Sequence, residues 1–159
     1  MTIFLRIAEP NDLDAIVQLR MRLFDNLVDF NKGKGVDDAL MQASRNYFAD
    51  AFQHGNCKTW VAEEQGQIVA CGSLVVFVRP PYPGNTAGKD AYLLNMYTLV
   101  EYRKLGLARK IVRLAMQYAH EQGYGKVWLH ATEDGQPLYA SEGFLGSSDY
   151  MEWEVKAGV

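Results

Sequence analysis

A turn spaced Arg-x-x-Gly-x-Ala, formed by Arg103, Gly106 and Ala108, carries the clearest chemical signal in this 159-residue chain. An apolar, β-prone run precedes the turn and an amphipathic pattern follows it, so the turn joins a strand to a helix. The first N–H groups of a helix have no partner within it, and the helix dipole favours an anion beside them. Glycine allows a ligand to approach the backbone closely. The turn therefore predicts a phosphate or pyrophosphate site, with plain turn chemistry as the alternative.

Charge and composition narrow the class of protein. Basic side chains gather at the turn, but the whole chain has a net charge of -3, which argues against nucleic-acid binding. No apolar run is long enough to cross a bilayer and the N-terminus shows no signal-peptide pattern, so we expect a cytoplasmic protein without membrane contact. Cys57 and Cys71 form no metal-ligand cluster, and we expect two buried free thiols rather than a disulfide.

The elements that must position the turn alternate between strand and helix patterns. Strands are predicted over residues 3–7, 58–63, 67–78, 91–99, 126–130 and 149–155. Helices are predicted to begin near residues 10 and 37, directly after Gly106, and at residue 136. This order predicts one α/β (α+β) domain over residues 1–159, with a mixed central sheet of about six to seven strands flanked by about four helices.

Three further features are candidates for a role in the site. Asn95 is a polar residue in an apolar strand, so it either fixes a strand irregularity or contacts substrate. Gly72 indicates a bulge or a close packing contact. The irregular stretch 79–90 is either a surface connection or a functional loop, and Arg79 and Tyr82 could line a substrate pocket there. An arginine in that pocket would favour a substrate that carries a carboxylate or phosphate.

Three motifs, taken in order, resemble those of the GNAT superfamily of acetyl-CoA-dependent N-acetyltransferases. Residues 102–108 resemble its pyrophosphate-binding motif, residues 137–144 its Leu-Tyr…Gly-Phe signature, and residues 6–12 the typical opening of such domains. The resemblance covers essentially the whole chain. It implies an enzyme that moves an acetyl group from acetyl-CoA to a primary amine of a small molecule or peptide, without a metal. Such domains often pair, so the resemblance also allows a homodimer.

The resemblance implies a coenzyme site where two strands splay apart, the strand of Met96 and the strand of Trp128. The backbone from Met96 to Thr98 would pair with the pantetheine arm, and the turn would hold the pyrophosphate. Thr132 stands where many relatives have an asparagine that contacts the arm. The residues expected to contact the coenzyme are Met96, Tyr97, Thr98, Arg103, Lys104, Leu105, Gly106, Leu107, Ala108, Arg109 and Thr132.

The same resemblance implies a catalytic role for Tyr139, which matches the tyrosine that often faces the coenzyme sulfur. A phenol is a suitable general acid for the leaving thiolate, and packing against the coenzyme is the alternative role. A backbone N–H near Tyr97 or Thr98 would polarise the thioester carbonyl. The base is left unassigned among Glu63, Glu64, Glu101, His130, Glu133 and Asp134. The competing functions are a non-catalytic coenzyme A sensor and a nucleotide-binding module, although the latter's Gly-x-Gly-x-x-Gly turn is absent from the sequence.

Overall fold

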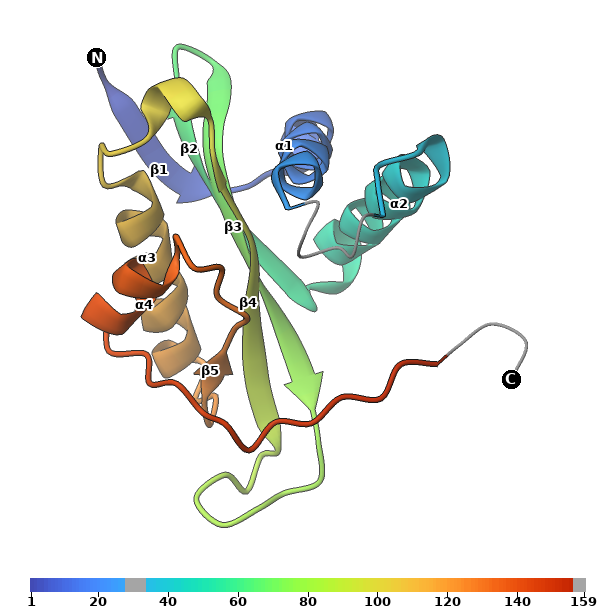
Figure 1. The fold of residues 1–159 in the computed structure, drawn as a ribbon, viewed down its shortest axis with the longest axis vertical. Coiled ribbons are helices and arrows are strands. Elements are labelled where there is room, and N and C mark those ends of the chain that lie inside the picture. Colours follow the sequence, from blue (N-terminus) through green and yellow to red (C-terminus); the bar gives the residue numbers. More distant parts are fainter. Residues whose placement is uncertain (28–33, 156–159) are drawn as a thin grey trace.

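A five-stranded mixed sheet forms the centre of the molecule in the computed structural model, which describes residues 1–27 and 34–155 (Figure 1). The strands lie in chain order and are β1 (Ile3–Ile7), β2 (Cys57–Glu64), β3 (Gln67–Val78), β4 (Lys89–Thr98) and β5 (Val127–Trp128). The first four strands pair antiparallel, whereas β4 and β5 run parallel. The predicted class, a single mixed α/β sheet, is therefore confirmed.

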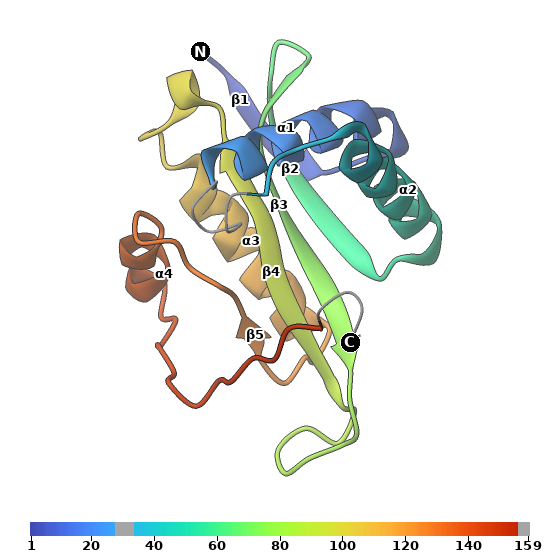
Figure 2. The ribbon, with the colours of Figure 1, turned by 45° about the vertical axis from the view of Figure 1, so that its right-hand side comes forward.

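Helices cover both faces of this sheet. Helices α1 (Leu13–Asn26) and α2 (Asp38–His54) lie on one face, and α3 (Leu107–Glu121) and α4 (Gln136–Ser141) lie on the other (Figures 1 and 2). Short 3₁₀ turns, η1 (Pro10–Asp12) and η2 (Val100–Tyr102), precede α1 and the loop before α3. The α1/α2 face and the α3/α4 face are thus separate surfaces of one sheet, and each buries an apolar helix stripe against it.

The buried core is continuous through the sheet. On the α3 side, Trp60 of β2 packs edge-on against Tyr118, with ring centroids 5.5 Å apart, and Ile111 is fully buried. On the other side, Ile16 of α1 is fully buried and Phe48 of α2 is 3% exposed. Both cysteines are buried free thiols, as expected. This core packs against both faces of β3, the central strand, and of its neighbour β4.

A bulge interrupts β4 at Asn95. Leu94 pairs with Ser73 and Tyr97 pairs with Cys71, so β4 has one residue more than β3 across this interval. Asn95 adopts φ +58°, a left-handed conformation that asparagine tolerates better than most residues. The side chain of Asn95 therefore meets the α1/α2 face while Met96 turns toward α3.

The glycine opposite this bulge is a close packing contact. A Cβ atom on Gly72 would lie 2.3 Å from Met96 Sδ and 2.6 Å from Ile111 Cγ2. The structure thus confirms the strand irregularity at Asn95 and the close contact at Gly72.

The prediction of a strand over residues 149–155 is wrong. The described part of this segment runs extended but pairs with no described strand, and Met151 and Trp153 are 93% and 80% exposed. The alternating pattern shows only that these residues suit a strand, and a strand also needs a neighbouring edge. Strand β5 is also shorter than predicted, with two residues. These differences account for five strands in place of about six to seven.

Candidate active site

The turn between β4 and α3 has the backbone conformation of an anion-binding loop. Lys104 and Gly106 adopt φ +64° and +78°, and α3 begins directly after Gly106. The N–H groups of residues 104–108 donate no hydrogen bond to any described residue. Free N–H groups that follow left-handed residues form a concave surface that suits a phosphate. This turn can therefore hold a pyrophosphate by its backbone.

The basic side chains of the turn have different tasks. Arg103 Nε donates to the carbonyl of Thr98 at 3.0 Å, and its guanidinium lies 5.5 Å from the centre of the Tyr97 ring. Arg103 thereby fixes the loop to the end of β4. Lys104 makes no ion pair with a described carboxylate, so its charge remains available to an anion.

Arg109 instead connects the helices α3 and α4. It forms an ion pair with Glu142 and donates to Ser141 Oγ at 2.9 Å. Arg113, one turn further along α3, donates to the same carboxylate at 2.9 and 3.1 Å. The pKa of Glu142 is lowered, mainly by its hydrogen bond with Arg113 and further by that with Arg109. The side chain of Arg109 is therefore engaged within the protein, and only its backbone faces the predicted cradle.

Strands β4 and β5 separate after Tyr92, before the bulge is reached. They pair only at Ala91 with Val127 and at Tyr92 with Trp128, and the chain then moves away from β4 toward α4 (Figure 2). Residues 96–98 of β4 keep β3 on one side, but no described strand pairs with their other edge. An open edge of this kind accepts an extended ligand as an added strand. The open edge leads directly into the pyrophosphate turn.

Thr132 and Tyr139 both lie next to Gly135, on the far side of this opening. Thr132 Oγ1 accepts the Gly135 N–H at 3.2 Å, and a Cβ on Gly135 would lie 3.1 Å from Tyr139 Cε2. Tyr139 is partly buried, and burial raises the pKa of its phenol. Its hydroxyl donates to no described residue. Tyr139 thus holds a protonated phenol at neutral pH that is free to donate.

The structure places Arg79 and Tyr82 in a different part of the molecule, in the loop that joins β3 to β4 (Figure 1). Asp90, which is fully buried, pairs with Arg79 and accepts the Tyr82 hydroxyl at 2.8 Å. Asn85 donates to the same carboxylate at 3.0 Å. These contacts order the loop internally and do not bring Arg79 or Tyr82 to Asn95. Their role in the acceptor pocket stays a prediction.

Arg20, which sequence reasoning missed, contacts Asn95 from α1. Its Nη1 donates to Asn95 Oδ1 at 3.3 Å, while Asn95 Nδ2 lies 3.7 Å from Cys71 Sγ. The guanidinium also lies 4.6 Å from the centre of the Phe24 ring. The available signal was spacing, because Arg20 follows Val17 and precedes Phe24 at helical intervals on the apolar stripe. A cation at such a position faces the sheet.

A group of aromatic rings lies on the same face, next to β5. The ring centroids of Tyr92 and Trp128 are 4.4 Å apart, and the Tyr92 hydroxyl lies 2.6 Å from His130 Nδ1. Phe77 and Tyr150 complete the aromatic cluster, through Trp128 and His130 respectively. This cluster forms an apolar wall with one titratable imidazole on the α1/α2 face.

Three of the candidate bases have structural partners. Glu63 accepts from Arg6 at 2.6 Å, and Glu64 accepts the Tyr102 hydroxyl at 2.5 Å. His130 is exposed, and its Nδ1 lies 2.6 Å from the Tyr92 hydroxyl. These contacts do not single out one of the three as the base.

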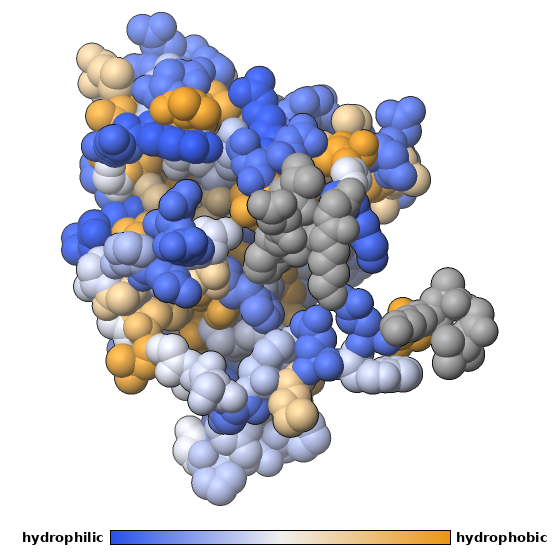
Figure 3. Space-filling model, in the orientation of Figure 1, coloured by the Kyte–Doolittle hydropathy of each residue, from blue (hydrophilic) through white to orange (hydrophobic). Residues whose placement is uncertain are grey.

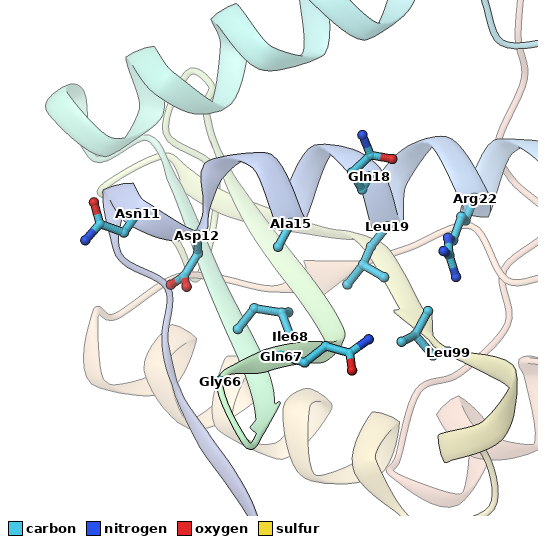
Figure 4. A pocket seen from close by; sticks show the side chains of 10 residues that line it. All are labelled: Asn11, Asp12, Ala15, Gln18, Leu19, Arg22, Gly66, Gln67, Ile68 and Leu99. Carbon is cyan, nitrogen blue, oxygen red and sulfur yellow. The ribbon is translucent and has the colours of Figure 1, made fainter.

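A cavity of about 420 Å³ lies elsewhere, between α1 and the β2–β3 turn (Figure 4). Its lining includes Asp12, Gln18, Arg22, Gln67 and Leu99. None of the predicted site residues lines it. The face shown in Figure 3 is mostly hydrophilic, with hydrophobic residues in small separate groups. The predicted coenzyme site therefore lies apart from this cavity, at the open edge of β4 and the turn before α3.

Metal-ligand groups and membrane-spanning helices are both absent from the described residues. No group of three or more His, Cys, Asp or Glu side chains is arranged to hold a metal ion in the part of the chain described. Among the described helices, none combines the length and the apolar character that a membrane span needs.

Comparison with known families identifies the class of protein. The model of the acetyltransferase (GNAT) family matches residues 15–144. The chain therefore belongs to this family, and the resemblance of its motifs is confirmed.

The chain matches curated relatives over only part of their length. The chain is 30% identical over 106 residues to human N-acetyltransferase 8, which is 64% of this chain and 44% of that protein. It is also 30% identical over 106 residues to an uncharacterized N-acetyltransferase, YjgM, of Escherichia coli (strain K12), which is 61% of this chain and 60% of that protein. The chain thus spans less than two thirds of the length of these relatives.

Solved structures match nearly end to end. A predicted acetyltransferase from Clostridium acetobutylicum, determined with acetyl-CoA, superposes with a TM-score of 0.85 at 27% identity and 96% coverage of both chains. A GCN5-related N-acetyltransferase from Ralstonia eutropha JMP134 gives a TM-score of 0.80 at 28% identity, covering 97% of this chain and 99% of that one.

Proposed function

We propose that this protein is an N-acetyltransferase that moves the acetyl group of acetyl-CoA directly to a primary amine. One observation carries the proposal: the free N–H groups of residues 104–108 continue the open edge of β4 at residues 96–98. A cradle for a pyrophosphate and an edge for an extended amide chain are the two features that coenzyme A requires. The solved relative that contains acetyl-CoA supports the same ligand.

The residues around the open edge of β4 have distinct roles in the proposed transfer. The acceptor amine loses a proton before attack, because only the neutral amine has a free electron pair. A backbone N–H near Tyr97 or Thr98 stabilises the negative charge on the carbonyl oxygen as the C–N bond forms. The carbon–sulfur bond then breaks, and the phenol of Tyr139 donates its proton to the departing sulfur. The proton that the attacking nitrogen loses as the amide forms restores the phenol through water. The raised pKa of Tyr139 keeps this proton in place at neutral pH.

The acceptor approaches from the α1/α2 face in this proposal. The coenzyme arm would lie between β4 and the segment that follows β5, and Asn95 stands at the bulge beside it. Thr132 would contact the arm from the opposite side. We also propose that the protein works in the cytoplasm and forms a homodimer, which gel filtration coupled to light scattering would test.

Thiol release from acetyl-CoA across a panel of amines tests the proposed function, together with calorimetry on acetyl-CoA and coenzyme A. Binding with thiol release on one class of amine would support the enzyme. Binding without release on any amine would favour the coenzyme A sensor. A protein that binds neither compound would contradict the proposal.

A further inference from the structure

Arg20 is a partly buried cation that has no carboxylate partner among the described residues. Its guanidinium lies between α1, α2 and the β4 bulge, 4.6 Å from the centre of the Phe24 ring and 5.9 Å from that of Phe48. Among the described residues, no carboxylate oxygen forms an ion pair with it. The arginines that do pair with a described carboxylate are Arg6, Arg45, Arg79, Arg109 and Arg113. A cation in so apolar a setting requires a compensating partner.

Within the described chain, most of the hydrogen-bond donors of Arg20 are unused. A guanidinium has five N–H donors, and one of them donates to Asn95 at 3.3 Å. No buried side-chain nitrogen or oxygen of the described residues lacks a hydrogen-bond partner. Arg20 is only half-buried, and none of its nitrogens is both completely buried and without a hydrogen bond, so a ligand can approach the guanidinium from its exposed side. Burial also lowers the pKa of Arg20, as expected for a cation without a nearby anion.

Arg20 lies close to the expected position of the acetyl group. Asn95, its hydrogen-bond partner, directly precedes Met96, where the expected coenzyme edge of β4 begins. The aromatic cluster lies further along the same face, through Tyr92. An acceptor that reaches the acetyl group from this face would therefore have a cation on one side and aromatic rings on the other.

We propose that the Arg20 guanidinium binds a carboxylate of the acceptor, which makes the acceptor a small amine that carries a carboxylate, such as an α-amino acid. The planar fork of arginine matches the two oxygens of a carboxylate. Arg79, the sequence-based candidate for this role, is already paired with Asp90. This inference rests on the proposed function, because the product it implies is an N-acetyl amino acid.

Two product-like probes test the proposal, and neither requires the acceptor itself to be identified. N-acetyl-L-phenylalanine and N-acetyl-L-phenylalaninamide share ring and acetamide and differ in the carboxylate. Their dissociation constants are measured by NMR titration of the protein saturated with coenzyme A. We expect the carboxylate probe to bind at least 10-fold more tightly, since charge-assisted hydrogen bonds contribute about ten- to hundredfold in affinity. A ratio below twofold, or no binding of either probe at 20 mM, would overturn the proposal.

Variants separate ligand binding from a purely structural role. Arg20→Gln should reduce the ratio to about one, and Arg20→Lys should leave an intermediate ratio because it keeps the charge without the fork. Asn95→Asp provides a carboxylate 3.3 Å from Arg20, so it should also abolish the preference while Arg20 is intact. Arg22→Gln is the matched control, because Arg22 lies on the same helix but is exposed. A preference that persists in Arg20→Gln would contradict the proposal.

The affinity for coenzyme A itself, measured on the same samples, distinguishes the role of Arg20 from the proposed function. Normal coenzyme binding without discrimination between the probes would remove the role of Arg20 and leave the proposed function intact. Absence of coenzyme binding in the unmodified protein would remove the proposed function. Normal coenzyme binding by each variant would also show that it is folded.

Discussion

The packing at Gly72 gives a quantitative prediction for the variant Gly72→Ala. The new methyl carbon would lie 2.3 Å from Met96 Sδ and 2.6 Å from Ile111 Cγ2. Ordinary contacts between such atoms are about 3.5–4.0 Å, so both neighbours must move by more than 1 Å or so. The Met96 thioether can change rotamer, but Ile111 is β-branched and fully buried.

The expected loss of stability follows from these overlaps. Overpacking of a dense core costs about 1–3 kcal/mol, and we expect about 2 kcal/mol here because one of the two neighbours can adapt. In a domain of this size 1 kcal/mol shifts Tm by about 2–4 °C, which gives a decrease of about 4–8 °C. Urea unfolding and thermal denaturation measure both quantities. Displacement of Met96 should also weaken acetyl-CoA binding.

Two controls make this prediction refutable. Gly146→Ala introduces the same methyl group where no heavy atom lies within 4 Å, so it should change stability by less than about 0.5 kcal/mol. Adding Met96→Ala to Gly72→Ala removes one overlap, so the two changes should cost less together than the sum of their separate costs. If Gly72→Ala unfolds like the unmodified protein, β3 does not pack against α3 as closely as these distances require.

Three further predictions concern the site, the β3–β4 loop and the N-terminal ion pair. Tyr139→Phe should lower kcat by about 100-fold with little change in the KM of acetyl-CoA, since a general acid contributes 10²–10⁴-fold; unchanged turnover would leave Tyr139 a packing role. Asp90→Asn should destabilise the protein by about 2 kcal/mol in urea without changing the acceptor KM, because its charged bonds order only the loop. A raised KM for the acceptor would instead indicate that the Arg79 loop contributes to acceptor binding. Arg6 lowers the pKa of Asp12, so the stability this carboxylate contributes is present above about pH 3.9 and is lost as pH falls through the lower folded value. Asp12→Asn should therefore flatten the acid side of the stability profile in urea titrations, and an unaltered profile would contradict this contribution.

The order of elements could be predicted because it depends on local patterns. Turn chemistry at Gly106 and the capping of α2 by Asp37, whose carboxylate accepts the Leu40 N–H at 2.8 Å, lie within a few residues in the chain. The strand irregularity at Asn95 could also be predicted, because a polar residue in an apolar strand needs a hydrogen-bond partner. Each of these signals is carried by neighbouring residues.

Features that depend on distant partners could not be predicted in this way. In the sequence Asp90 looks like an ordinary loop residue, whereas in the structure it is buried and bonded to Arg79 and Tyr82. The alternation over residues 149–155 predicts a strand, but pairing depends on an edge that the described chain does not offer it. The relation of Arg20 to Asn95 joins residues 75 positions apart. Such contacts arise from tertiary packing, and a local pattern does not show which distant residues will meet.

The most direct test of the central claim is an acetyl-CoA titration of the ¹⁵N-labelled protein followed by amide NMR. We expect the amide signals of residues 104–108 to shift most, because their N–H groups would bind the pyrophosphate, and those of residues 96–98 to shift at the same ligand concentrations. Saturable shifts that leave both segments unchanged and appear instead around the cavity beside α1 would contradict it.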